Sequence, residues 1–127
     1  MFGYKVLCVQ YNKGGLGTPT ATVKVQKPDG SMVSEASIGN GPVDAVFKAI
    51  WRALGLQLEL ELVDFSVSAT SSGSETSGQV VVHIQKDGQV HEGTGLGTDI
   101  IVASAEAFVE ALNKMEKFEA AVAAHTV

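Results

Sequence analysis

Apolar and polar residues alternate along the segment 19–27, where alanine and valine occupy every second position. A period of two places the apolar side chains on one face of a β-strand and the polar ones on the other. Segments 4–12 and 31–38 are also predicted to be strands, because both are rich in β-branched and other apolar residues. A glycine-rich stretch at 13–17 predicts a flexible turn, and Pro28-Asp29-Gly30 predicts a hairpin turn.

The period changes after Gly41. From Pro42 to Leu54 the apolar residues recur at intervals of three and four, which is typical of an amphipathic helix. Pro42 suits the first helical position, and Gly55 suits the C-terminal cap. The stretch Gly39–Ala45 is therefore predicted to be a strand-to-helix corner with free backbone N–H groups and the positive end of a helix dipole. Such a corner either only connects the two elements or also holds a carboxylate or phosphate.

The order of three strands and a helix begins again at residue 59. Strands are predicted over 59–70, 78–85 and 89–96, with a Ser/Gly/Thr loop at 71–77. A second helix is predicted after Gly97, with Thr98 or Asp99 as its N-cap. The final segment, 116–127, is rich in alanine and is compatible with a longer helix or with fraying.

The two halves, about 4–55 and 59–117, coincide when the sequence is shifted by 58 residues. The coincident pairs are Asp29-Gly30 with Asp87-Gly88, Gly39 with Gly97, Ile38 with Leu96, Ala45 with Ala103, Ala49 with Ala107, Ala53 with Ala111, Leu54 with Leu112, Val9 with Val67 and Val23 with Val81. We infer an α+β fold of duplicated β-β-β-α units, with antiparallel sheets and one helix each. The alanines spaced by four predict close packing of each helix on a sheet or on the other helix. Stacking of the halves, or pairing with a second chain, would bury the remaining apolar surface.

The net charge of the chain argues against some classes of binding partner. The chain has 127 residues, a net charge of -5 and no basic cluster, which argues against nucleic acid and anionic membranes. No apolar run reaches the ~18 residues that cross a bilayer, and the first residues do not resemble an export signal. Cys8 is the only cysteine, which favours the reducing cytoplasm, and its apolar neighbours predict a buried, inert thiol.

Histidines and glycines give no convincing catalytic or cofactor motif, so no cofactor and no metal are predicted. His83 and His91 lie on adjacent predicted strands but lack a third ligand, and His125 lies in the tail. The run Gly93–Gly97 superficially resembles a phosphate loop but lacks the lysine of a Walker motif.

Asp44 and Asp99 differ from the other carboxylates, because each lies in the first turn of a predicted helix at corresponding corners of the repeat. Two interpretations are open. Either they cap the helix and complement its dipole, or one of them receives the ammonium group of a ligand.

Three motifs occur in a fixed order: Gly39-Asn40-Gly41-Pro42-Val43-Asp44-Ala45, then Asp64-Phe65, then Gly93-Thr94-Gly95-Leu96-Gly97-Thr98-Asp99-Ile100-Ile101-Val102-Ala103-Ser104 closing on Ala111-Leu112-Asn113. Together they resemble the C-terminal regulatory domain of 2-isopropylmalate synthase and citramalate synthase, over roughly residues 5–117. The resemblance implies that residues 1–127 form a single regulatory domain of two β-β-β-α units that associates as a homodimer. It also implies that this chain alone is not an enzyme, because the catalytic barrel of the acyl-CoA-dependent synthase lies outside it.

The resemblance implies a branched-chain amino acid as effector and feedback inhibition of the catalytic barrel. Leucine is the effector for 2-isopropylmalate synthases and isoleucine for citramalate synthases. A structural dimerisation module without sensing, or a small enzyme that uses His83 and His91, are the alternatives. The ligand-binding residues implied by the resemblance are Gly39, Asn40, Gly41, Val43, Asp44, Leu62, Phe65, Ala69, Thr76, Gly78 and Leu96. Phe65 replaces a tyrosine that is common in the family, which removes a hydroxyl.

Overall fold

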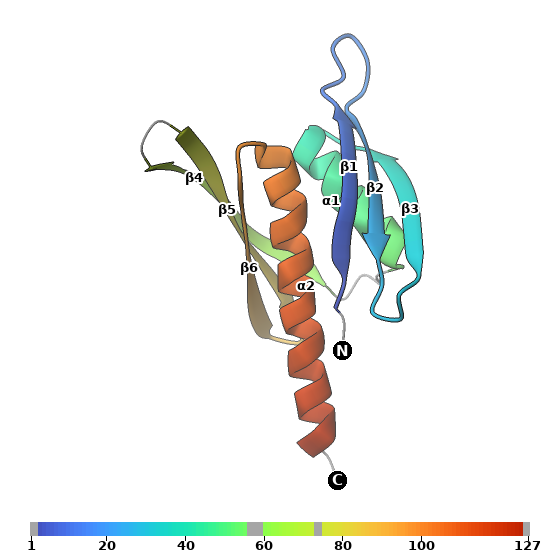
Figure 1. Cartoon of the computed structure of the whole chain (residues 1–127). Coiled ribbons are helices and arrows are strands. Elements are labelled where there is room, and N and C mark those ends of the chain that lie inside the picture. Colours follow the sequence, from blue (N-terminus) through green and yellow to red (C-terminus); the bar gives the residue numbers. More distant parts are fainter. Residues whose placement is uncertain (1–2, 56–59, 73–74, 126–127) are drawn as a thin grey trace.

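A computed structural model describes residues 3–55, 60–72 and 75–125, and in these ranges the chain forms two three-stranded antiparallel sheets and two helices (Figure 1). The first half consists of β1 (Lys5–Asn12), β2 (Thr20–Gln26), β3 (Met32–Ile38) and α1 (Pro42–Leu54). The second half consists of β4 (Glu61–Ser72), β5 (Glu75–Lys86), β6 (Gln89–Gly97) and α2 (Ile100–His125). The predicted α+β fold of duplicated β-β-β-α units is confirmed.

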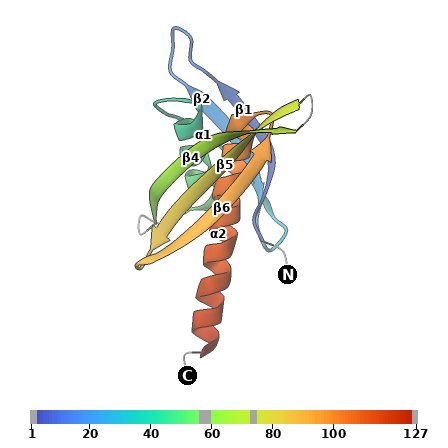
Figure 2. The same cartoon turned by 90° about the vertical axis from the view of Figure 1, so that its left-hand side faces the viewer.

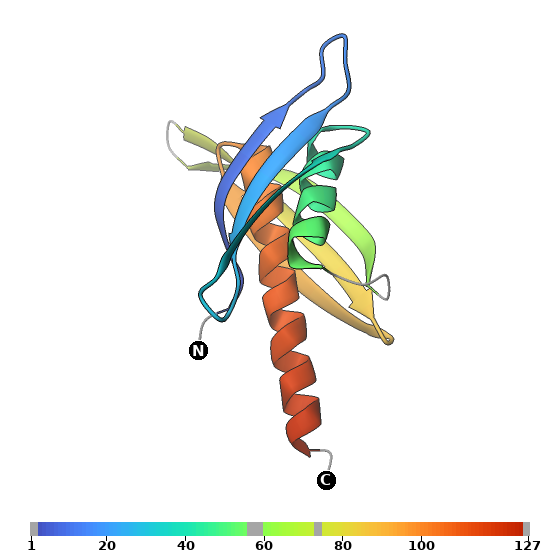
Figure 3. The ribbon, with the colours of Figure 1, turned by 90° about the vertical axis from the view of Figure 1, so that its right-hand side faces the viewer.

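Both helices lie between the two sheets. Figures 2 and 3 show the molecule from opposite sides, and in each view a sheet lies in front of the helices. The inner faces of β2 and β5 are completely buried at Val23, Val25, Val80, Val82 and Ile84. The core therefore forms where the two inner sheet faces meet the apolar faces of the helices, as the period of two and the period of 3.6 require.

The strand pairing shows that the single offset of 58 residues does not hold for every pair of equivalent strands. Val23 pairs with Val9 in the first sheet, and Val82 pairs with Phe65 in the second. Equivalent strands are therefore offset by 56 residues for β1 and β4 and by 59 for β2 and β5. The offset of 58 holds for β3, β6 and the helices.

Two of the predicted equivalences, Val9 with Val67 and Val23 with Val81, are consequently wrong. The cause is the length of the connections. Five residues separate the paired residues Gln26 and Met32 whereas four separate the equivalent Gln85 and Val90, and seven separate the paired residues Asn12 and Thr20 whereas ten separate the equivalent Ser68 and Gln79. The offset of 56 is supported by a β-bulge at the same place in β1 and β4, between Val6 and Cys8 and between Leu62 and Asp64.

The alanine stripe of α2 lies directly on β6. A Cβ atom at Gly93 would overlap the carbonyl oxygen of Ala107, and one at Gly95 would overlap that of Ala103. The run Gly93–Gly97 is thus a strand whose glycines admit a close helix, and it is not a phosphate loop. Of the two packing partners predicted for the stripe, the sheet is confirmed.

The predicted loop at 71–77 is too long, because β4 and β5 stay paired up to Ser72 and Glu75; the predicted start of the fourth strand at Glu59 lies outside the described residues. The alanine-rich tail continues α2 to His125. No helix in the described ranges is long and apolar enough to cross a membrane.

The prediction of a buried Cys8 is wrong, because its side chain is exposed. Val6 and Val9 take the inner face of β1, and the bulge at Leu7 interrupts the alternation between them. Cys8 pairs with Lys24 on the outer face of the sheet as a result.

Candidate functional site

The corner between β3 and α1 depends on Gly39. A Cβ atom at this position would overlap the backbone nitrogen of Ala45 and lie 2.8 Å from a carboxylate oxygen of Asp44. The Gly39 N–H donates to the carbonyl of Pro19 at 3.0 Å. These contacts seat the chain closely against the first turn of α1, so the position of the helix end is fixed.

The N-terminus of α1 keeps backbone donors available. Gly41 is its N-cap, with an extended backbone and no side-chain capping hydrogen bond, and Pro42 follows in the first turn. The Ala45 N–H is the first to bond back, to the carbonyl of Gly41 at 2.9 Å. The N–H groups of Val43 and Asp44 belong to the first turn and have no helical carbonyl to bond, and the helix dipole is positive at this end.

Asp44 caps the corner, as the first of its two predicted roles requires. Its Oδ2 accepts the Asn40 N–H at 2.9 Å and lies 3.0 Å from Nζ of Lys48. The hydrogen bond from Asn40, followed by the Lys48 ammonium, lowers the pKa of this carboxyl below its ordinary value, against a partial opposing effect of burial. None of these contacts involves Oδ1.

Replacing Asp44 with asparagine is expected to lower the free energy of unfolding by about 0.5–1 kcal/mol at pH 7, because a charge-assisted bond at a helix start becomes a neutral one. The pKa of Asp44 is depressed in the folded state. The difference between wild type and Asp44→Asn should therefore be complete above the ordinary pKa of 3.8 and disappear as the pH falls through the folded-state pKa. Urea unfolding of both proteins from pH 7 down to pH 3 measures this, and a difference that persists unchanged at the lowest pH contradicts it.

Strand β4 crosses α1 in the views of Figures 2 and 3, and Figure 1 shows that its far end points away from the helix. Phe65 packs edge-on against Phe47 of α1, with 5.8 Å between ring centroids. Beyond Phe65, the inner-face residues Val67 and Ala69 are exposed. This edge strand thus presents an exposed apolar surface beyond its contact with α1.

The predicted residues Gly78 and Thr76 belong to the neighbouring strand. Gly78 pairs with Ala69, and a Cβ atom on it would overlap the side chain of Ile100 at the start of α2. Thr76 pairs with Ser71 further along the same ladder. The structure therefore groups Gly39–Asp44 at the corner and extends the apolar surface from Phe65 to Gly78 across two strands.

Leu62 and Leu96 lie apart from this group. Leu62 is at the other end of β4, seven residues from Ala69, a separation of roughly 23 Å along a strand. Leu96 pairs with Gln79, so it lies on the outer face of the sheet whereas Phe65 lies on the inner face. One small ligand cannot contact Leu62, Ala69 and Leu96 of the same chain together.

Sequence reasoning missed two residues. Val67 shares the inner face with Phe65 and Ala69, and the alternation of β4 could have indicated it. Asn113 accepts the Tyr4 N–H at 2.7 Å and donates to the Tyr4 carbonyl at 2.9 Å, which ties α2 to the start of β1. The available sequence signal was that Asn113 is a single amide residue directly after the apolar residues Ala111 and Leu112 of the predicted helix.

The histidines do not form a metal site. His83 lies on the outer face between Asp64 and Glu92, at 3.4 and 3.1 Å from their carboxylates. His91 is buried on the inner face against the ring of Phe118, with 5.4 Å between centroids. Within the described ranges no group of three potential ligands is suitable for a metal ion.

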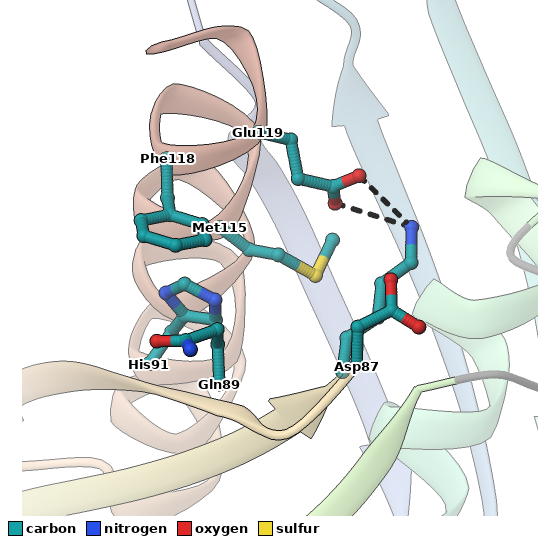
Figure 4. Close-up of a pocket in the computed structure, with 7 residues that line it drawn as sticks. Asp87, Gln89, His91, Met115, Phe118 and Glu119 are labelled. Atoms are coloured by element: carbon teal, nitrogen blue, oxygen red, sulfur yellow. Dashed lines mark hydrogen bonds and ion pairs between the residues drawn. The ribbon is translucent and has the colours of Figure 1, made fainter. Parts of the chain in front are cut away.

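Two cavities lie elsewhere, along α2. Figure 4 shows the smaller one, of about 40 Å³, which Met115, Phe118, His91 and the Lys86–Glu119 ion pair surround. The larger one, of about 630 Å³, lies between α2 and the start of the chain near Tyr4. None of the predicted binding residues lines either cavity.

The fold and the corner define a duplicated β-β-β-α domain in which the N-cap of α1 makes no side-chain hydrogen bond and the edge strand β4 has an exposed apolar inner face. Residues 2–116 match the family model described as the LeuA allosteric (dimerisation) domain, and the chain belongs to this family. It is 45% identical over 112 residues to the 2-isopropylmalate synthase of Gloeobacter violaceus, 43% to that of Trichodesmium erythraeum and 42% to that of a Nostoc species. The matches cover 88% of this chain but 20–21% of those proteins, so the chain spans about a fifth of the length of these relatives.

Proposed function

We propose that the chain is the leucine-binding allosteric domain of a 2-isopropylmalate synthase and mediates end-product inhibition of that enzyme. The family description and the names of the relatives support the allosteric role. The structural observation that carries the proposal is the α1 corner. Its glycine N-cap leaves first-turn N–H groups available, and β4, which contacts α1 through Phe65, exposes an apolar inner face beyond that contact.

Each part of an amino acid has a complementary group at this corner. The carboxylate accepts the N–H groups of Val43 and Asp44 at the positive end of α1. The ammonium group donates to Oδ1 of Asp44, which the Asn40 and Lys48 contacts leave available. The branched side chain packs on Val67 and Ala69 beside Phe65, where apolar burial contributes about 25 cal/mol per Å².

Isoleucine is the second candidate effector, as in a citramalate synthase. The two side chains differ only in the position of a methyl group, which such a pocket discriminates by about 1–3 kcal/mol. We favour leucine because the relatives are named 2-isopropylmalate synthase. A dimerisation module without sensing is the remaining alternative, and it binds none of these amino acids.

Isothermal titration calorimetry of this chain with leucine, isoleucine and valine tests the proposal. Leucine is expected to bind most tightly and to raise the midpoint of thermal unfolding in a concentration-dependent way. Leucinamide is the matched control, because it keeps the side chain and loses the carboxylate; its affinity should be roughly 10–100-fold lower. Absence of heat and of any thermal shift with all three amino acids would falsify the sensing role.

Inhibition further requires that leucine bind the inhibited and active states of the whole enzyme with different affinities. We propose a homodimer of this domain, coupled to a catalytic barrel in a cytoplasmic enzyme. In the full-length protein, leucine should then inhibit synthesis, and deletion of this domain should remove the inhibition without abolishing catalysis.

A further inference from the structure

The two corners of the duplicated fold differ at two equivalent positions. The offset of the helices places Gly41 and Asp99 at the same position, the N-cap of α1 and of α2. The offset of the first strands makes Val67 of β4 equivalent to Tyr11 of β1, because Tyr11 pairs with Ala21 and Val67 with Val80 at matching inner-face positions. The α1 corner therefore has Gly41 and Val67 at the positions where the α2 corner has Asp99 and Tyr11.

At the α2 corner the side chain of Asp99 satisfies the helix end. Its Oδ1 accepts the N–H groups of Ile101 at 2.9 Å and of Val102 at 3.2 Å. Its Oδ2 lies 3.3 Å from the hydroxyl of Tyr11, which donates to it. Both oxygens of a carboxylate are thus bound at this corner, one by the helix end and one by the adjacent strand.

At the α1 corner the equivalent residues supply neither a carboxylate for the helix end nor a hydroxyl from the strand. Gly41 makes no side-chain capping bond, and Val67 has no hydroxyl and is 47% exposed. The strand also meets its helix differently, through the Phe47–Phe65 ring pair, where the equivalent positions in the other half hold Ala105 and Val9. The larger pair adds bulk between α1 and β4 immediately before Val67.

We propose that Asp99, held by Tyr11, is a built-in substitute for the carboxylate of the ligand, so that each chain binds one amino acid, at the α1 corner only. The residue at the N-cap decides which corner binds ligand: a glycine leaves the N–H groups to an external carboxylate, and an aspartate occupies them from within. This inference rests on the proposed function, since it concerns the same binding site.

Calorimetry with leucine tests the proposal on wild type, Gly41→Asp and Gly41→Ala. Wild type should bind one leucine per chain. Gly41→Asp copies the α2 corner and should weaken binding at least tenfold more than Gly41→Ala does, while its midpoint of thermal unfolding stays equal or rises by a degree or two. The backbone of Gly41 is extended and a Cβ atom there meets no neighbour within 4 Å, so both variants should fold.

The reciprocal variant, Asp99→Gly, should keep the leucine affinity of wild type within about twofold and lose a few degrees of thermal stability. Two leucines per wild-type chain, equal losses for Gly41→Asp and Gly41→Ala, or loss of binding in a folded Asp99→Gly would each overturn the inference and leave the proposed function standing. No binding of leucine, isoleucine or valine by wild type would instead overturn the proposed function, and with it the inference.

Discussion

Replacement of Gly93 by alanine is expected to prevent folding or to lower the free energy of unfolding by at least about 3 kcal/mol. The added Cβ would overlap the carbonyl oxygen of Ala107 and approach the backbone nitrogen of Ala111 at 2.5 Å. Backbone atoms of a helix cannot rotate away as a side chain can, so α2 would have to lift from β6. Lifting the helix would also expose the alanine stripe and the buried residues Phe108 and Leu112.

Gly97→Ala is the matched control, because it adds the same methyl group four residues later in β6. A Cβ atom at Gly97 meets only the backbone nitrogen of Asp99, at 4.0 Å. Circular dichroism and thermal unfolding of the two variants measure the effect. If Gly93→Ala melts within a few degrees of Gly97→Ala, the close seating of α2 on β6 is wrong.

The sequence pattern predicts the elements well because each carries its own local signal. The three-and-four spacing after Pro42 and the Asp87-Gly88 turn specify a helix and a hairpin without reference to the rest of the chain. The fold class followed from repeating these elements. Loop 71–77 was overestimated because serine and threonine are common both in loops and on exposed edge strands.

The face of a strand residue is less predictable. A slip of one residue moves every side chain to the other face, and neither a bulge nor one additional hairpin residue has a clear sequence signal. That is why Cys8 was predicted to be buried and why Val23, on the inner face, was aligned with Val81, on the outer face. For the same reason, the prediction that His83 and His91 lie on adjacent strands did not show that they lie on opposite faces of the sheet.

The candidate site was predictable in part for the same reason. The corner residues Gly39 to Asp44 are contiguous, so the local pattern of glycine, proline and aspartate located them together. The apolar surface on β4 depends on the register between strands and on where α1 ends. Its residues could be suggested only by resemblance, although the separation of seven residues between Leu62 and Ala69 on one predicted strand already placed these two far apart.

Phe108 connects the two halves of the fold. Its side chain is 1% exposed, and its ring lies 4.9 Å from that of Phe47 and 6.2 Å from that of Trp51, both on α1. Phe47 in turn contacts Phe65 of β4. The aromatic cluster therefore joins α2, α1 and the strand beside the candidate site.

Replacing Phe108 with alanine is expected to lower the free energy of unfolding by about 3–5 kcal/mol, because a large buried ring is lost and a cavity remains between the helices. A domain of this size has a total stability of only about 5–15 kcal/mol, so the variant should be marginally folded. Phe118→Ala, on the exposed part of the same helix, removes the same group from a side chain that is 41% exposed and should cost less than about 1.5 kcal/mol. Urea unfolding of both variants gives the comparison, and leucine should restore part of the stability of Phe108→Ala because it binds only the folded chain. Equal losses in the two variants would show that the aromatic cluster does not hold the halves together.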